Sequence, residues 1–354
     1  MKIKKITIEN FRSIGIEEII FPESGILSLV GPNNAGKSNI MKAVYNILGD
    51  NWFNGERAEI NDYFMKDSSN TIKIGIYFDD GKKVLFDSKE GWASYFDVQR
   101  PNEQLKKINQ WNIPTGSTGS VKDDFPCTLL PANRSLEKNL QFRSYELMGK
   151  IAKKFNEKAK ERKVELETKF GEVMDILNAV DGFSGFKSDF IDFFNEMQSD
   201  SPYKLKVDFK AFSPLNYFKT INILANDSSV DEEFNIDIEE LGEGNKSLIL
   251  FSLLRSYAKN MKQEATGILA IEEPEIYLHP QARRHLYSIF QEIVRESNIQ
   301  IIYTTHSPDF ISTEEFDSLG LVSKDPEEGT QLKIVTKKEL VDFSINTGVP
   351  ASKT

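Results

Sequence analysis

The sequence predicts an α/β protein, in which helices pack against a β-sheet, and two sets of observations support this prediction. Apolar runs of strand length occupy Ile26 to Val30, Ile268 to Ile271 and Ile299 to Tyr303, as expected of strands buried on both faces. Segments with apolar residues three and four positions apart follow two of these runs, at Ile40 to Leu48 and Pro280 to Arg295, as in amphipathic helices. The length of 354 residues favours two structural units.

Composition limits the class of protein. No apolar run approaches the roughly 20 residues of a membrane span, and the N-terminus lacks the apolar region of a signal peptide, so we expect a cytoplasmic protein without membrane contact. The net charge of -10 argues against a generally basic nucleic-acid-binding surface, although it allows a local basic stripe. The single cysteine, Cys127, excludes an internal disulfide and is expected to be a small core residue without a chemical role.

The N-terminal part is predicted to hold two strands before a glycine-rich loop. Ile6 and Ile8 alternate with polar residues and Phe11 closes the first strand, while Ile26 to Val30 forms the second. A helix follows the loop, and Gly49 is a suitable C-terminal cap for it.

The next segments are predicted to form a hairpin and then a helical region. Residues 72–78 and 83–86 are predicted to pair as a hairpin, because Asp80-Gly81 suits a left-handed turn. From Tyr145 to Met197 the pattern is helical. This segment includes Phe183, Phe186, Phe190, Phe193 and Phe194. These aromatic residues form either a helical core or an apolar face that pairs with another subunit.

Alternation returns after this helical segment. Lys204 to Phe212 and Tyr217 to Leu224 are predicted strands, and Lys246 to Ala258 is a predicted helix.

The glycine-rich loop predicts a phosphate site. Residues Gly31 to Ser38 read GPNNAGKS between a strand pattern and a helix pattern, which is the order that a P-loop requires. Gly31 and Gly36 let backbone N–H groups approach a phosphate chain closely. Lys37 supplies a positive charge for the β and γ phosphates, and the Ser38 hydroxyl can ligate Mg²⁺. ATP with Mg²⁺ is the expected ligand.

Two adjacent carboxylates follow the apolar strand at Ile268. Glu272 and Glu273 stand where this strand ends, and ligands of open α/β sheets bind at such strand ends. Consecutive strand residues point to opposite sides, so the two glutamates have different roles. Glu272 is predicted to support the magnesium shell, and Glu273 to orient and deprotonate the attacking water.

A histidine and a glycine-rich turn complete the candidate site. His306 follows another apolar strand in Tyr303 to Pro308 (YTTHSP). It can hydrogen-bond a γ-phosphate or the attacking water, so its contacts would depend on which nucleotide is bound. His279 and His285 are weaker candidates, and His285 is more consistent with a solvated helix face. The turn Leu241 to Ser247 (LGEGNKS) leads into a helix expected to begin near Lys246, which would create a second anion-binding helix end.

Taken together, these motifs resemble the ABC-type ATPases and, more narrowly, the OLD (overcoming lysogenization defect) family, which is related to the SMC and RecF group. The residues that carry the resemblance are Glu9 to Ser13 (ENFRS), Gly31 to Ser38, Ile268 to Arg284 (ILAIEEPEIYLHPQARR) and Thr305 to Pro308 (THSP).

The resemblance implies an ABC-type P-loop ATPase head with a mixed sheet and an inserted helical segment. Residues 1–139 and 201–354 would form the head, and residues 140–200 would mediate dimerisation. Two heads would meet so that each ATP touches the P-loop of one subunit and the signature turn of the other.

The resemblance also assigns roles to residues. The implied ATP-binding set is Arg12, Asn33, Asn34, Ala35, Gly36, Lys37, Ser38, Asn39, Gly244 and Lys246. Arg12 would approach the phosphates, Gly244 and Lys246 would act across the dimer, and Lys37, Glu273 and His306 would serve catalysis, with His306 as the switch. Asn245-Lys246 stands where the family commonly has glutamine, so the side chain that meets the γ-phosphate stays open, as does the choice of Gln99 or Gln104 for the Q-loop.

The functional expectation follows from the family. OLD proteins usually continue into a Toprim nuclease domain, and no Toprim signature is found in these residues, so we expect the nuclease in a further domain or a partner protein. The chain would be a dimeric or larger ATPase that regulates nuclease activity in anti-phage defence, with DNA as a candidate ligand. The alternatives are an ATP-gated interaction module or a RecF-like DNA repair ATPase with little turnover. The EEPE and LHP pattern disfavours a transporter engine.

Overall fold

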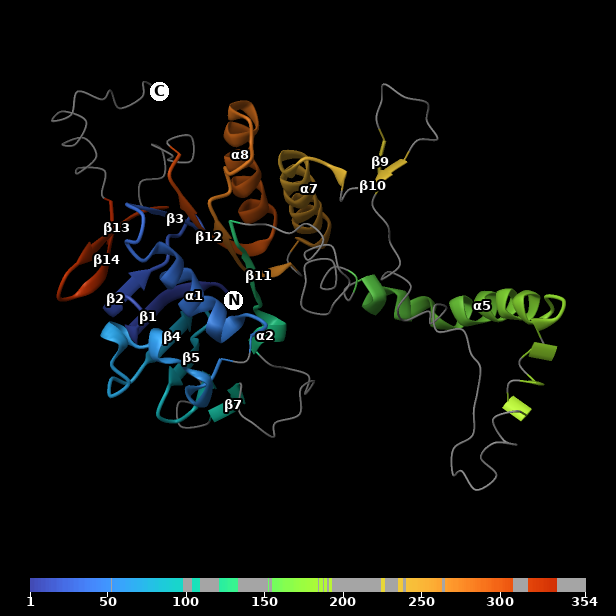
Figure 1. Cartoon of the computed structure of the whole chain (residues 1–354), viewed down its shortest axis with the longest axis horizontal. Helices are drawn as coiled ribbons and strands as arrows, with labels where there is room; N and C mark the ends of the chain where they lie inside the picture. The colour runs from blue at the N-terminus through green and yellow to red at the C-terminus, as the bar shows by residue number, and fades with distance from the viewer. Residues whose placement is uncertain are drawn as a thin grey trace. The chain divides into compact units, whose positions relative to one another are not determined.

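A computed structural model describes two compact units of the chain (Figure 1). Residues Met1–Leu136 and Leu241–Thr354 form the first unit, called the head below, and Glu137–Glu240 form the second. The described residues are 1–51, 53–97, 104–108, 121–132, 152, 155–183, 185–186, 188–189, 191–192, 224–226, 235–237, 240–262, 265–307 and 318–335. The domain limits expected from the sequence, at 139/140 and 200/201, remain predictions.

In its described residues, the head is built on one sheet of 12 strands. The strands are β1 (Ile3–Phe11), β2 (Ile14–Ile20), β3 (Ile26–Val30), β4 (Lys73–Phe78), β5 (Lys82–Asp87), β6 (Trp92–Asp97), β7 (Gln104–Ile108), β8 (Cys127–Leu130), β11 (Thr266–Glu272), β12 (Asn298–Thr305), β13 (Leu319–Asp325) and β14 (Gly329–Ile334). Their order across the sheet is β7-β6-β5-β4-β1-β2-β14-β13-β3-β12-β11-β8.

Strand direction divides this sheet into two parts. Strands β13, β3, β12, β11 and β8 run parallel to one another. Strand β14 is antiparallel to both β13 and β2, and β1, β2 and β4 to β7 also form antiparallel pairs. The parallel part contains the near-continuous apolar runs, as expected of strands covered on both faces. The predicted α/β P-loop head with a mixed sheet is therefore confirmed.

Helices cover the sheet. The head contains α1 (Lys37–Leu48), α2 (Val121–Asp124), α7 (Glu243–Met261) and α8 (Pro280–Glu296), with short 3₁₀ turns η1 (Gly55–Arg57), η2 (Ile60–Asp62) and η3 (Phe64–Lys66). The predicted helices at Ile40 and Pro280 are confirmed. The expected start of α7 near Lys246 is wrong, because the helix begins at Glu243 with Gly242 as N-cap. Gly244 thus belongs to the first helical turn.

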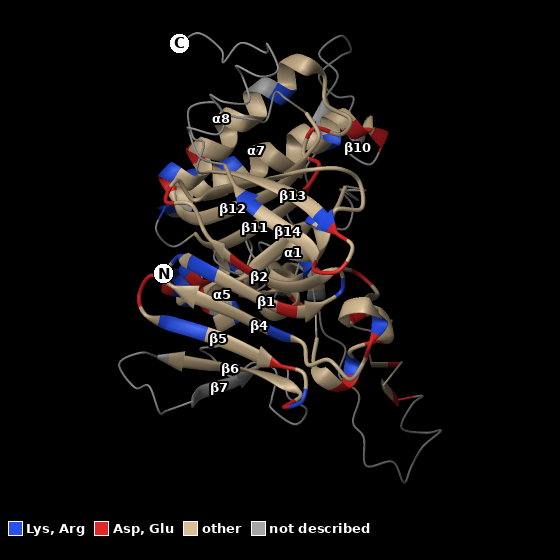
Figure 2. Cartoon of the chain, turned by 90° about the vertical axis from the view of Figure 1, so that its left-hand side faces the viewer, with Lys and Arg blue, Asp and Glu red and all other residues tan. Residues whose placement is uncertain are grey.

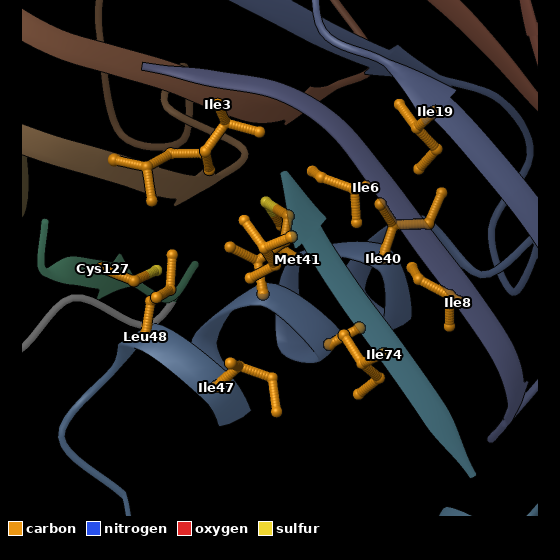
Figure 3. Close-up of a cluster of buried hydrophobic side chains, with 14 of the residues drawn as sticks. Ile3, Ile6, Ile8, Ile19, Ile40, Met41, Ile47, Leu48, Ile74 and Cys127 are labelled. Carbon is orange, nitrogen blue, oxygen red and sulfur yellow. The ribbon is translucent and has the colours of Figure 1, made fainter. Parts of the chain in front are cut away.

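The main core lies between α1 and the sheet. Figure 3 shows Ile40, Met41 and Ile47 of α1 turned toward strand side chains such as Ile6 and Ile74, and all of these residues are 0–1% exposed. Burying a side chain of this size contributes roughly 1.5–3 kcal/mol relative to exposure, so this contact fixes α1 on the sheet. Cys127 also lies buried in the same cluster, as predicted.

Two predictions about local strands have different outcomes. The hairpin at Asp80-Gly81 is confirmed: β4 and β5 pair in antiparallel fashion, and Gly81 has φ 84°. The expectation of two strands before the glycine-rich loop is wrong, because β2 lies between them. Glu17 and Glu18 obscured its pattern, although the Glu17 carboxylate is buried and accepts a hydrogen bond from the Leu332 N–H at 3.1 Å.

The second unit is described in part. It contains η4 (Lys160–Arg162), α5 (Lys163–Asn178) and the two-stranded pair β9 (Leu224–Asn226) and β10 (Asn235–Asp237). Helix α5 confirms part of the helical pattern predicted from Tyr145 to Met197. Phe183 and Phe186 stack at a centroid distance of 6.5 Å. Three predicted features lie outside the described residues: Phe190, Phe193 and Phe194, the strand at Lys204 to Phe212, and most of the strand at Tyr217 to Leu224.

Candidate nucleotide site

The P-loop connects β3 to α1 in a conformation that needs glycine. Gly36 is the N-cap of α1 with φ 107° and ψ 8°, and no side chain caps the helix start. A Cβ at Gly36 would overlap the Thr330 hydroxyl and lie 2.8 Å from Ser13 Oγ. Asn33 and Asn34 are exposed at the loop tip, and Asn34 also has a left-handed backbone with φ 68°. The open helix start offers backbone N–H groups to an anion.

Lys37 bends back over this loop. Its ammonium donates to the carbonyl oxygens of Gly31 at 2.8 Å and Pro32 at 2.9 Å, which uses two of its three N–H donors. The residue is 7% exposed. Burial lowers the pKa of Lys37 below its ordinary value, and the nearby charge of Glu273 partly offsets this effect. The buried charge is therefore held at the loop with a donor left for a phosphate oxygen.

Strand register brings the distant motifs to the same sheet edge. In the parallel pairs, Glu272 stands opposite Thr304, and Thr305 stands opposite Val30. The C-terminal ends of β3, β11 and β12 therefore lie next to one another, and Figure 1 shows these strands side by side. This edge is where open α/β sheets bind ligands.

Glu273 and His306 meet at this edge. The Glu273 N–H donates to the carbonyl and hydroxyl oxygens of Thr304, at 3.0 and 3.1 Å. The carboxylate Oε1 of Glu273 lies 3.9 Å from His306 Nε2, and both side chains are partly exposed. Glu273 has φ 43°, so the chain turns sharply after β11. Lys37, Glu273 and His306 are thus brought together, whereas Oε2 of Glu272 faces the Ala132 N–H at 3.3 Å.

Glu275 was missed as a site residue. It is 7% exposed, and its Oε1 accepts hydrogen bonds from the Thr305 hydroxyl and from the backbone N–H groups of His306 and Ser307. The last glutamate of the EEPE motif could have been considered, because a buried carboxylate needs several donors.

Asp62 was also missed. Its Oδ1 accepts from Arg12 Nε at 3.0 Å and Nη2 at 2.9 Å, and its carbonyl accepts from the Arg12 N–H. Asp62 therefore holds Arg12 through both backbone and side chain.

A third group supports the P-loop from β14. Thr330 Oγ1 donates to the Ala35 carbonyl at 2.9 Å and lies 2.7 Å from Ser13 Oγ, which in turn accepts from Asn39 Nδ2. Thr330 is fully buried. No local sequence signal links Thr330 to Ala35, which it contacts from the far end of the chain.

The remaining predicted residues have their own surroundings. The Lys246 ammonium pairs with Glu243 of its own helix at 3.0 Å, and a Cβ at Gly244 would lie 2.8 Å from the Tyr277 carbonyl oxygen. His279 is the N-cap of α8, and His285 is exposed on that helix, as its pattern indicated. Gln104 lies in the edge strand β7, and Gln99 lies outside the described residues.

Comparison with known families identifies the chain. The model of the family described as "AAA ATPase domain" matches residues 1–122 and 94–311. The chain belongs to this ATPase family. Among curated relatives, it is 26% identical to the OLD nuclease of Thermus scotoductus, covering 95% of this chain and 65% of that protein. It is 25% identical to the Old nuclease of Escherichia phage P2, covering 96% of this chain and 62% of that protein. The chain thus spans slightly less than two thirds of the length of these relatives.

Solved structures agree with this AAA ATPase assignment at the level of the fold. An SMC head bound to the C-terminal winged-helix domain of ScpA matches with a TM-score of 0.53 and 16% identity, covering 96% of this chain and all of that one. The SMC head with an extended coiled coil from Pyrococcus furiosus matches with a TM-score of 0.50 and 15% identity, over 98% and 99% of the two chains. The predicted membership in the OLD family, related to the SMC and RecF group, is confirmed. Within the described part of the chain, no helix has the length and apolar character of a membrane span.

Proposed function

We propose that this AAA ATPase binds ATP with Mg²⁺ at the P-loop and hydrolyses it, and that this cycle controls a nuclease activity. The observation that carries the proposal is the meeting of Lys37, Glu273 and His306 where β3, β11 and β12 end. A phosphate-binding cation, a carboxylate and a histidine at one strand edge are the groups that phosphoryl transfer to water requires.

The residues present fit ATP and Mg²⁺. The uncapped start of α1 and the Lys37 ammonium provide donors for phosphate oxygens, and the Ser38 hydroxyl with Glu272 would hold the cation. When bound, Mg²⁺ supplies charge neutralisation on the β and γ phosphates. Glu273 orients the attacking water and accepts its proton, Lys37 balances charge that develops on the phosphoryl oxygens, and His306 contacts the γ-phosphate. Arg12, aimed by Asp62, reaches the phosphates, with Asn33, Asn34, Ala35, Gly36 and Asn39 forming the rest of the loop.

The site is proposed to be completed by a second copy of the chain. Gly244 and Lys246, near the exposed first turn of α7, would close over the ATP held by the partner head. The helical segment at 140–200 would add a dimer contact, because Val164 and Ile176 of α5 are 78% and 70% exposed.

The regulated activity is proposed from the relatives' names alone. Both curated relatives are named nucleases, and the nuclease would belong to a further domain or partner, with anti-phage defence as the setting in the cytoplasm. DNA would bind elsewhere than on the face in Figure 2, where Lys and Arg interleave with Asp and Glu over β1, β2, β4 and β5. The pairs Lys5 with Glu18 and Lys73 with Glu9 cross neighbouring strands there.

Steady-state ATP turnover of Glu273→Gln tests the chemistry. We expect a loss of about a hundredfold to ten-thousandfold in kcat, the usual cost of removing a positioned general base, with binding of an ATP analogue retained. Glu327→Gln, in the exposed turn between β13 and β14, is the matched control and should hydrolyse ATP like wild type. Equal turnover in wild type and Glu273→Gln would refute the role of Glu273. Equally slow turnover combined with analogue-driven self-association would favour an ATP-gated interaction module.

Subunit mixing tests the composite site. Lys37→Ala and Lys246→Ala should each be inactive alone, whereas a mixed dimer keeps one site in which both lysines are present. Random exchange makes half of the dimers mixed with one intact site of two, so about one quarter of wild-type turnover should return. No recovery after verified subunit exchange would contradict a site shared between subunits.

A further inference from the structure

We propose that Glu275 is a positioning residue for ATP hydrolysis, whose buried carboxylate holds the segment Thr305 to Ser307 so that His306 faces Glu273. This inference rests on the proposed roles of Glu273 and His306, and it assigns a task to a residue that is neither in the P-loop nor one of these two.

Three donors converge on one oxygen of Glu275. Its Oε1 accepts from the Thr305 hydroxyl at 2.6 Å, from the His306 N–H at 2.9 Å and from the Ser307 N–H at 3.2 Å. The donors come from three consecutive residues at the end of β12, so they fix both the direction of the strand exit and the orientation of two peptide groups. Hydrogen bonds to an ionised acceptor are roughly twice as strong as those between neutral groups.

The other oxygen of Glu275 is buried at a cost that no described contact offsets. Oε2 is buried and has no hydrogen-bond partner among the described residues. A buried acceptor without a partner costs free energy, and such groups in folded proteins are uncommon. Among the described residues, the hydrogen bonds to this carboxylate therefore all come from Thr305, His306 and Ser307.

His306 lies between two fixed points. On one side, the Glu273 N–H is bonded to the carbonyl and hydroxyl oxygens of Thr304. On the other side, the Glu275 carboxylate is bonded to the segment that follows Thr304. Pro274 joins the two glutamates and restricts the turn between them. A change in length or charge at Glu275 therefore shifts the His306 backbone relative to the Glu273 carboxylate, which lies 3.9 Å from the imidazole.

This network is separate from the phosphate-binding loop. The P-loop is held by Lys37 and by Thr330 from β14, and no hydrogen bond among the described residues joins either of them to Glu275. Loss of the Glu275 carboxylate should therefore lower kcat and leave nucleotide affinity intact, a separation that general destabilisation of the head would not produce.

A double-mutant cycle in the whole chain tests the inference. Glu275→Gln keeps the size and one acceptor oxygen but removes the charge, and we expect kcat to fall about tenfold to a hundredfold. The Kd of a fluorescent ATP analogue should stay within about twofold of wild type. Because Glu275 is argued to act through His306, the double variant Glu275→Gln/His306→Ala should be no slower than His306→Ala alone.

Further variants separate positioning from folding. Thr305→Val removes one of the three donors while keeping the shape of the side chain, and should lower kcat in the same direction by a smaller factor. Asp67→Asn, which alters a carboxylate bonded to a backbone N–H at an exposed turn, is the matched control and should leave kcat unchanged. If Glu275→Gln unfolds the head, Thr305→Val replaces it in the double-mutant cycle with His306→Ala.

Each result has a defined meaning. Independent, multiplying losses in the double variant, or a parallel loss of analogue binding, would overturn the positioning role. If His306→Ala and Glu273→Gln slow hydrolysis but Glu275→Gln and Thr305→Val do not, only this inference fails. If His306→Ala leaves kcat at the wild-type value, the proposed role of His306 fails and this inference fails with it.

Discussion

Replacing Gly36 by alanine tests the closest approach in the P-loop. Gly36 has φ 107°, a conformation that L side chains rarely adopt. An added Cβ would also overlap the Thr330 hydroxyl and lie 2.8 Å from the Thr330 methyl group. Thr330 cannot easily move away, because it is fully buried and bonded to Ala35 and Ser13.

The expected cost has two parts. A non-glycine residue held in a sparsely populated backbone region costs about 1–3 kcal/mol. Overpacking a buried contact costs about 1–3 kcal/mol more. Gly36→Ala should therefore lower the free energy of unfolding by about 2–6 kcal/mol, a large share of the stability of a typical domain.

Urea unfolding without nucleotide, followed by circular dichroism, measures this loss. Gly91→Ala is the matched control, because Gly91 has φ 82° but, apart from its chain neighbours, no described residue lies within 4 Å of its would-be Cβ. Gly91→Ala should show the backbone cost alone, about 1–3 kcal/mol. Thr330→Ala in the Gly36→Ala background should recover part of the difference. Equal losses in Gly36→Ala and Gly91→Ala would refute the packing argument.

Three further predictions concern residues other than Lys37, Glu273 and His306. Burial lowers the pKa of Lys122 from 10.5 to about 8. Between these pH values Lys122 is protonated in the unfolded chain but not in the folded one, so the free energy of unfolding rises with pH. Lys122→Met should flatten this rise when urea unfolding is measured at several pH values. Gln300→Leu should lower the free energy of unfolding, measured by calorimetry, by about 2–4 kcal/mol, because it leaves the buried N–H and carbonyl of Ile3 without their partner. A decrease of less than about 0.5 kcal/mol would contradict this reasoning. Thr330→Val should weaken ATP-analogue binding about tenfold, equivalent to about 1.4 kcal/mol, whereas Thr330→Ser keeps the hydroxyl bonded to Ala35 and should bind normally.

Much of the head could be predicted from local pattern. The strands at Ile26, Ile268 and Ile299 are buried on both faces, so their apolar runs are continuous and easy to recognise. By contrast, β13 and β14 were not predicted, because residues such as Ser323 and Lys324 interrupt their apolar pattern where the hairpin faces solvent. Local pattern also could not give the strand order, because it depends on pairing between distant segments.

Some residues of the candidate site could likewise be predicted from local motifs, and others could not. Lys37, Glu273 and His306 are adjacent to recognisable motifs, so their meeting followed from the rule that parallel strands end at one edge. Asp62 and Thr330 lie in a 3₁₀ turn and a hairpin without such motifs. Their contacts to Arg12 and Ala35 depend on tertiary register, which a single sequence does not specify.

The position of β3 has a consequence for the order in which the protein is made. Both neighbours of β3, β12 and β13, come from the last part of the chain, and Ile26 pairs with Ile301, which is 275 positions later (301 minus 26). At about 5–20 residues per second, a ribosome needs roughly 14 to 55 s to make that interval. Throughout this time the P-loop has been synthesised but the strand before it has neither partner, so its apolar side chains require protection and the nucleotide site can form only late in synthesis.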